Sequence, residues 1–212
     1  MKILDLRKEL KYLYAPSAKV VSVVDVPCFQ FAMIDGKIEP GHSPGNSPAF
    51  QQALEALYGI SYTLKFTLKL RKEDPIDYPV MALEGLWWVN DKEFDITQPE
   101  GWQWTAMMMQ PNPITKEIFQ EGLNQLRRKR GDQPAFSLLR LESFQEGLSI
   151  QVMHLGPYAN EMVTIARMDV YAQENGYQLH GKHHEIYLGD PRRANPAKLK
   201  TVLRHPVYKK KH

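Results

Sequence analysis

Glu185 is the residue whose type and neighbours most directly suggest chemistry. It lies in the run His183 to Leu188, where the alternation of a strand places His183, Glu185 and Tyr187 on one face. Burying a carboxylate between an imidazole and a phenol is unfavourable unless the group has a function. In an apolar seam its pKa would rise toward that of a useful general base, and it would attract cationic ligands. The alternative is an edge strand whose polar face meets solvent.

The tryptophans are concentrated in one part of the chain, because all four lie between residues 87 and 104. On strands, the adjacent Trp87 and Trp88 point to opposite faces, whereas Trp102 and Trp104 share one. Large rings in one sheet region suit a flat aromatic ligand, since ring stacking contributes about 0.5–1.5 kcal/mol per pair beyond burial. The competing interpretation is a tryptophan-rich core.

Other common chemistries find little support in the sequence. The histidines match no zinc-site spacing, and the single cysteine, Cys28, has no CxxC partner. There is no G-x-S-x-G elbow, no P-loop and no G-x-G-x-x-G fingerprint. We therefore expect neither a metal site nor an organic cofactor.

Composition limits the class of protein. The 212 residues are 43% hydrophobic and 24% charged, within the soluble globular range. The net charge is +3, and the three lysines near the end, Lys209 to Lys211, account for all of it, so direct nucleic-acid binding is not expected. The lone cysteine fits a reducing cytoplasm, and the longest uncharged stretch, Gly101 to Thr115, is too short to span a membrane.

The first half of the chain reads as a strand, a helix and then further strands. A helix should begin at Pro48 with Ser47 as its N-cap and end at Gly59. The predicted strands are residues 20–26 with 29–34, 61–70, 78–89 and 101–110.

The second half repeats that order after a connecting helix at about 114–130. Its predicted elements are strand 148–155, helix 160–174 and strands 183–188 and 201–207. Either duplication or chance explains the faint identity between the halves. We predict an α+β fold of tandem pseudo-repeated β-α-β-β modules with antiparallel sheets and a ligand cleft between them. The expected division is an extension (1–19), module one (20–111), a connector (112–147), module two (148–207) and a basic tail (208–212).

Short motifs in order carry a resemblance to a known family. His154-Leu155-Gly156-Pro157-Tyr158 followed by Glu161 resembles the H-x-G-P-Y signature of the GyrI-like small-molecule-binding domain. The segments 57–66, 83–88, 183–193 and 200–207 are similar to its stand-alone members, so the resemblance covers residues 20–207. Residues 1–19 are too few for the helix-turn-helix domain of the regulator relatives.

The resemblance implies the fold expected above, with Glu185 as the central glutamate of the cleft. Stand-alone members with a tryptophan-rich cleft are described as cyclopropanoid cyclopropyl hydrolases, which detoxify DNA-alkylating natural products. By this resemblance Glu185 would activate water and Tyr187 or Tyr62 would bind the substrate oxygen. Further candidate contacts to the apolar aromatic substrate are Trp87, Trp104, Trp88, Phe66, Met108 and His183. The alternative is a binding module that sequesters such molecules without catalysis.

Overall fold

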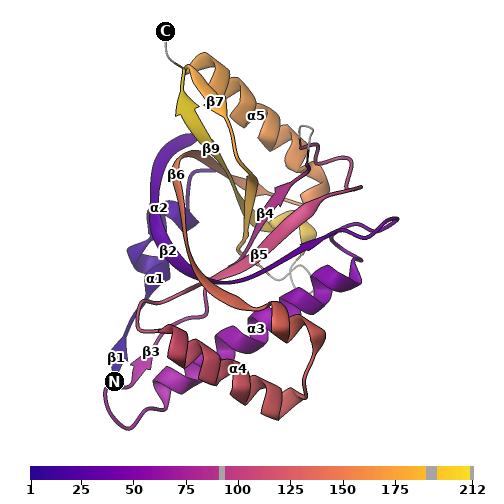
Figure 1. The fold of residues 1–212 in the computed structure, drawn as a ribbon. Helices are drawn as coiled ribbons and strands as arrows, with labels where there is room; N and C mark the ends of the chain where they lie inside the picture. Colours follow the sequence, from indigo (N-terminus) through magenta and orange to yellow (C-terminus); the bar gives the residue numbers. More distant parts are fainter. Residues whose placement is uncertain (91–93, 190–194, 211–212) are drawn as a thin grey trace.

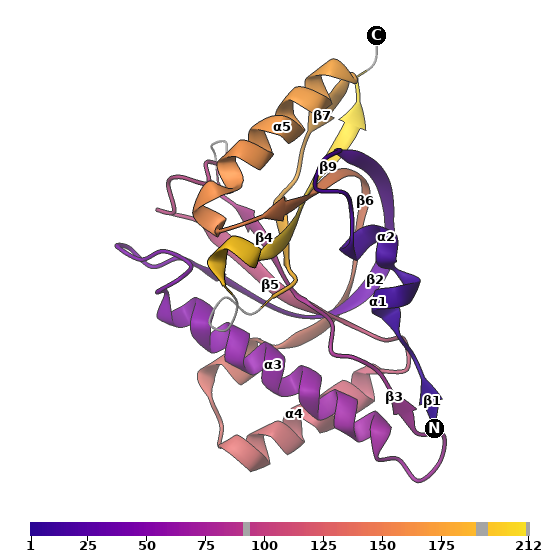
Figure 2. The same ribbon diagram turned by 180° about the vertical axis from the view of Figure 1, so that it is seen from behind.

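A computed structural model describes residues 1–90, 94–189 and 195–210 (Figures 1 and 2). Two short helices precede the first long strand, and three longer helices accompany the sheet. The helices are α1 (Leu6–Glu9), α2 (Lys11–Tyr14), α3 (Pro48–Lys69), α4 (Lys116–Arg130) and α5 (Glu161–Glu174), with 3-10 turns at Pro134–Leu138, Tyr158–Asn160 and Pro196–Lys198. The strands are β1 (Lys2–Ile3), β2 (Ser22–Lys37), β3 (Ile76–Asp77), β4 (Leu83–Trp88), β5 (Gln103–Gln110), β6 (Arg140–Leu155), β7 (Tyr177–Leu179), β8 (His183–Tyr187) and β9 (Lys200–Lys209).

The main sheet is antiparallel and closes on itself. Its strand order is β6-β2-β5-β4-β8-β9-β7, and β6 also pairs with β9, so six strands form a barrel with β7 added at its edge. β2 and β6 can each curve around the barrel because they are 16 residues long, as Figure 1 shows. β1 and β3 form a separate parallel pair.

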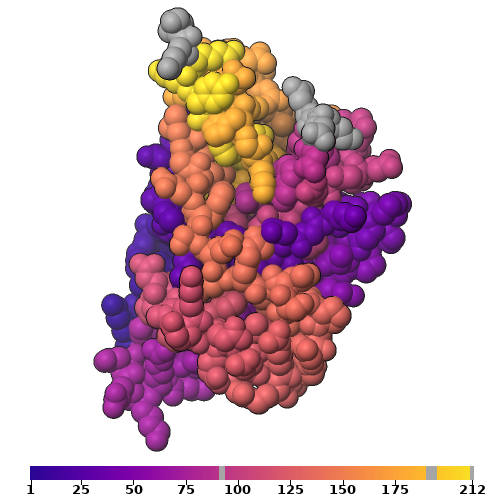
Figure 3. Space-filling model, viewed as in Figure 1, coloured from indigo at the N-terminus to yellow at the C-terminus, as the bar shows by residue number. Residues whose placement is uncertain are grey.

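The chain order confirms the predicted α+β fold with two β-α-β-β units. The first unit is β2-α3-β4-β5 and the second is β6-α5-β8-β9. The units meet where β2 pairs with β6 and β4 pairs with β8. In the space-filling view the C-terminal segments form the top of the molecule and the α3 and α4 region forms the bottom (Figure 3).

Helix α3 corrects one prediction from the sequence. It continues through Gly59 to Lys69, so the strand predicted for residues 61–70 is wrong. Leu64 and Leu68 are four residues apart, a spacing that fits both an alternating strand and one face of a helix. Together with Ile60 they extend the buried face of α3, and burial of that face decides for the helix. Gly59 does not end the helix; it lies against Leu126 of α4.

The connector also differs from the prediction. Strand β6 begins at Arg140, well inside the predicted connector of 112–147, because its first half pairs with β2. The short strand β7 was not predicted. The helix expected at about 114–130 is confirmed as α4, with the Thr115 hydroxyl accepting from the amide of Ile118 as its N-cap.

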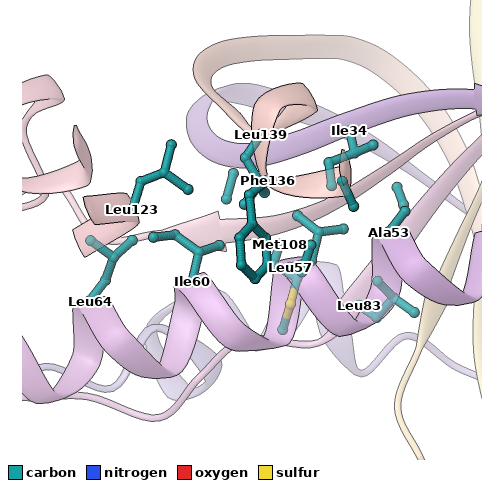
Figure 4. Close-up of a cluster of buried hydrophobic side chains, with 14 of the residues drawn as sticks. Ile34, Ala53, Leu57, Ile60, Leu64, Leu83, Met108, Leu123, Phe136 and Leu139 are labelled. Carbon is teal, nitrogen blue, oxygen red and sulfur yellow. The ribbon is translucent and has the colours of Figure 1, made fainter. Parts of the chain in front are cut away.

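One core lies between the sheet and the helices α3 and α4. Side chains from α3 interlock with those of β2, β5 and the turn before β6, including Ile34, Leu57, Met108 and Phe136 (Figure 4). The Ser47 hydroxyl caps the start of α3 by accepting from the amide of Phe50, as predicted. This core fixes the sheet face on which Trp87 and Trp104 lie.

A charged network lies inside the barrel, next to a second apolar cluster. His184 lies between the carboxylates of Glu84 and Glu146, each 3.0 Å from a ring nitrogen. Arg204 contacts Glu146 at 3.1 Å, and the Tyr14 hydroxyl of α2 donates to Glu84 at 2.6 Å. Two acids and two bases therefore balance one another, and α2 is tied to the barrel.

None of the helices within the described residues combines the length and the apolar character needed for a membrane span.

Candidate functional site

Glu185 lies on the outer face of the barrel, toward the helices. The residue is 6% exposed and stands opposite Gly85 of β4 in the strand register. His183 and Tyr187 share its face, as the alternation predicted, whereas His184 points into the barrel. The alternative of a solvent-facing edge strand is excluded, since β8 is paired on both sides.

A chain of hydrogen bonds holds the Glu185 carboxylate. The indole N–H of Trp87 donates to the Tyr187 hydroxyl at 3.0 Å, and that hydroxyl donates to Oε2 of Glu185 at 2.7 Å. Nε2 of His183 lies 3.3 Å from Oε1. Burial and the charge of Glu185 raise the pKa of Tyr187 well above its ordinary value, so the phenol remains a donor.

Gly85 makes room for this chain. A Cβ at Gly85 would lie 2.7 Å from Nε1 of Trp87 and 3.2 Å from the Tyr187 hydroxyl. The absence of a side chain therefore lets the indole and the phenol meet above the strand. The adjacent acid, Glu84, points to the other face and belongs to the charged interior.

Rings surround the hydrogen-bonded chain. The aromatic cluster comprises Phe50, Trp87, Phe94, Trp102 and Trp104. Phe50 packs against both Trp87 and Trp104 with ring centroids 5.1 Å apart. Trp102 covers Trp87 at 5.5 Å, and Phe94 stacks on His183 at 5.4 Å with only 15° between the planes. In this structure the protein's own rings thus occupy the positions beside Trp87 and His183.

Glu161 is a second acid at the site. It stands at the start of α5, is 1% exposed, and its Oε1 has no hydrogen-bond partner among the described residues. Burial, and then the negative charge of Glu185, raise the pKa of Glu161 to about 9. Glu161 therefore retains its proton near neutral pH.

The H-x-G-P-Y motif positions that acid. His154, at the end of β6, places Nδ1 2.8 Å from the Thr164 hydroxyl of α5 and Nε2 3.2 Å from the Pro157 carbonyl. Gly156 adopts a φ of +127°, which a residue with a side chain rarely does. The turn leads into Tyr158, whose ring meets Tyr187 edge-on at 5.6 Å.

A groove of about 560 Å³ lies next to the aromatic cluster. Its walls are residues of the loop after β4 and one side of α5, namely Val89, Phe94, Asp95, Ile96, Gln98, Met162, Ile165, Ala166 and Asp169. Phe94 belongs both to this groove and to the stack on His183. Movement of its ring would therefore join the groove to the site.

The structure separates four of the predicted contact residues from Glu185. Trp88 lies on the opposite face of the sheet, with the Lys182 ammonium 3.3 Å above its ring. Met108 is buried under α3, where the Ser61 hydroxyl contacts its sulfur (Figure 4). Tyr62 and Phe66 stand on the exposed face of α3, 51% and 49% accessible, because the segment is a helix and not the predicted strand.

Sequence reasoning missed three residues that the fold brings to the site. Phe50 and Phe94 gave no distinct signal, since isolated phenylalanines are ordinary core residues. Glu161 stood in the quoted motif, and its place at a helix start was visible, but its burial beside Glu185 was not. Within residues 1–90, 94–189 and 195–210, no three His, Cys, Asp or Glu side chains gather as a metal site would require.

The family comparison matches most of the chain. Residues 20–207 match the model of the GyrI-like small-molecule binding domain. The chain belongs to this family. The resemblance predicted from the motifs is thereby confirmed, and so is the coarse function, small-molecule binding.

Three solved structures from Listeria innocua share the GyrI-like fold over nearly the full length. An uncharacterized conserved protein is 37% identical with a TM-score of 0.87, covering 97% of this chain and 100% of its own. Two structures described as hydrolases are 35% and 36% identical with TM-scores of 0.81 and 0.83. Their alignments span 97% and 98% of this chain and 100% of the two relatives' chains. A search of curated protein sequences gave no match.

Proposed function

We propose that this GyrI-like chain binds flat, apolar aromatic molecules at the aromatic cluster and hydrolyses an electrophilic cyclopropane ring. The observation that carries the proposal is the pair of buried acids, Glu185 and Glu161, together with the raised pKa that keeps Glu161 protonated near neutral pH. The addition of water requires a base that accepts a proton from the water and an acid that donates a proton to the product, and a buried site strengthens both interactions. Two relatives over 30% identical are described as hydrolases, which supports the reaction class.

The substrate would replace rings of the protein. Phe94 and Trp102 come from the loop after β4; Phe94 stacks on His183 as a flat ligand would, and Trp102 packs at a tilt against Trp87. A ligand that displaces them keeps the walls formed by Trp87, Trp104 and Phe50. The groove between this loop and α5 can receive the displaced rings or the rest of the ligand.

The reaction proceeds in one displacement. A water oxygen bonds to the strained methylene carbon as the carbon–carbon bond to the dienone ring breaks. The released electron pair makes the ring aromatic and converts the dienone oxygen to a phenolate. Glu185 takes a proton from the water, and the protonated Glu161, or the Tyr187 hydroxyl once it is released from Glu185, gives its proton to the phenolate; the proton on Glu185 then returns to that donor. The atoms balance as substrate plus one water, with no cofactor.

Mass spectrometry tests the hydrolysis directly. A spirocyclopropyl dienone is incubated with much less protein than compound, and the product is expected to gain the mass of one water over many turnovers. Unchanged compound with quenched tryptophan fluorescence would contradict catalysis and leave the non-catalytic alternative, a sequestering module.

Glu185→Gln separates the two roles of the site. The amide fits the same space but cannot accept the proton, so we expect turnover to fall by about 10²–10⁴-fold while fluorescence quenching by the compound persists. Glu174→Gln, an exposed position at the end of the same module's helix, is the control and should leave turnover unchanged. Full turnover in Glu185→Gln would refute the assignment of Glu185 as the base.

A further inference from the structure

A second groove lies at the mouth of the barrel, on the opposite face of the sheet from Glu185. It holds about 540 Å³ and is formed where β2, β4, β5, β6 and β8 begin or end. Its walls are Asp35, Gly36, Lys37, Trp88, Gln103, Thr105, Arg140 and Lys182. The charged interior around Glu84 lies at the opposite end of β4, so the groove is a separate feature.

The acids near this groove already have partners. Nη2 of Arg140 contacts Asp35 at 2.9 Å, and Nε contacts Glu142 at 2.7 Å. The Thr105 hydroxyl also donates to Asp35 at 2.6 Å. The Arg140 guanidinium thus pairs with the carboxylates of both Asp35 and Glu142. Neither carboxylate can then fully neutralise a second cation.

Lys182 is a cation of this groove without an acidic partner among the described residues. Its ammonium stands 3.3 Å above the Trp88 ring, and no carboxylate among the described residues lies within ion-pair distance. Burial lowers its pKa, with Asp35 and Arg140 acting in opposite directions. The indole contacts one side of the ammonium, and the remaining N–H groups can donate into the groove. Lys37 on the same wall adds a second positive charge.

We propose that this groove binds a small oxyanion, the carboxylate, phosphate or sulfate group of a small molecule, with Lys182 as its principal ligand. The three lining cations exceed the single lining carboxylate, and a half-buried ammonium gains most from a new charged partner because water solvates it incompletely. The Gln103 amide lies on the same wall as a further donor. This inference does not depend on the hydrolase proposal, since the two grooves lie on opposite faces of the sheet.

Nuclear magnetic resonance of the full chain tests the proposal. Inorganic phosphate, sulfate and acetate are titrated separately at constant ionic strength, with chloride as the reference anion. We expect saturable shifts of the Trp88 indole N–H with at least one oxyanion. Saturation with acetate assigns carboxylates to the groove, and saturation with phosphate or sulfate alone assigns the tetrahedral anions.

Variants of one lysine decide whether the binding is specific. Lys182→Met keeps the length of the apolar stem and should weaken binding by about tenfold, whereas Lys182→Arg should restore it. Lys72→Met, at an exposed lysine in the loop before β3, is the control. Absence of saturable shifts with all three anions overturns the proposal, as does equal binding by Lys182→Met and the wild-type protein.

Discussion

At the scale of single residues, the site depends on two buried acids, Glu185 and Glu161. A carboxylate excluded from water is costly, and a second negative charge nearby makes it costlier, so the pKa of Glu161 lies well above the usual value of a carboxyl group. Burial and the negative charge of Glu185 keep the proton on Glu161, whose Oε1 has no hydrogen-bond partner among the described residues. Glu185 instead accepts a hydrogen bond from Tyr187, so we assign the role of acid to Glu161 and that of base to Glu185.

Glu161→Gln should change how stability depends on pH. The pKa of Glu161 is about 9 in the folded protein against an ordinary 4.5, so the folded state binds the extra proton between these values. The contribution of the neutral Glu161 carboxyl group to the free energy of unfolding is complete below about pH 4.5 and is lost as the pH rises through about 9. The glutamine cannot ionise, so we expect its melting temperature relative to wild type to be a few degrees higher at alkaline than at acidic pH. Thermal unfolding monitored by circular dichroism measures this difference, and a difference independent of pH would contradict it.

At the scale of elements, the pairing of β4 with β8 builds the site. The register places Gly85 across from Glu185, and alternation sends Trp87 and Tyr187 to the same side. The two strands come from different β-α-β-β units, so neither unit holds the hydrogen-bonded chain alone. The helix α5 then brings Glu161 over this pair.

Gly85→Ala tests this arrangement. The added methyl group would lie within 2.7 Å of the Trp87 nitrogen, and the indole must move away from Tyr187. We expect a loss of about 1–3 kcal/mol in the free energy of unfolding and a shifted Trp87 indole resonance. Gly45→Ala is the control, because its Cβ would have only the Ser43 hydroxyl at 4.0 Å. Equal stability of the two variants in urea would show that the contact is unimportant.

At the scale of the whole molecule, a neutral charge network joins the N-terminal segment to the barrel. Tyr14 donates to Glu84, and Nη2 of Arg204 donates to the Leu13 carbonyl at 2.9 Å. Burial alone would raise the pKa of Glu146, but His184 and Arg204 outweigh it and lower the pKa to about 2. Burial alone would lower the pKa of His184, but Glu146 and Glu84 raise it to about 9.

These shifts predict a stability maximum at mildly acidic pH. The contribution of protonated His184 is complete below about pH 6.5 and is lost as the pH rises through about 9. The contribution of ionised Glu146 is complete above about pH 4.5 and is lost as the pH falls toward about 2. We therefore expect the free energy of unfolding to be greatest between about pH 4.5 and 6.5, where the neutral form of Glu161 also stabilises the folded state. Urea unfolding across this range measures it, and a maximum at alkaline pH would contradict the network.

Tyr14→Phe tests the link between α2 and the barrel. Removing the hydroxyl leaves an oxygen of the buried Glu84 without its donor, which we expect to cost about 1–3 kcal/mol of unfolding free energy. Tyr12→Phe, at a ring that is 51% exposed, is the control and should change stability little. A loss of the same size in both variants would show that the effect is not due to the Glu84 contact.

The sequence predicted much of the fold because its signals are local. Ser47 before Pro48 specifies the start of α3 within a few residues, and the helices predicted at about 114–130 and 160–174 correspond to α4 and α5. The alternation around Glu185 likewise assigned His183 and Tyr187 to its face. Where a local signal was ambiguous, as in residues 61–70, packing of α3 against the sheet decided the outcome.

By itself, the sequence determined the family, the two β-α-β-β units and the face that Glu185 shares with Tyr187. Only the tertiary structure decided that Phe50, Phe94 and Glu161 lie beside that face. It also decided that Trp88 points to the opposite face and that Tyr62 and Phe66 lie on the exposed side of α3. The reason is physical: periodicity fixes the direction of a side chain relative to its own strand or helix. Which partner that side chain meets, and whether water reaches it, depends on contacts between elements far apart in the chain.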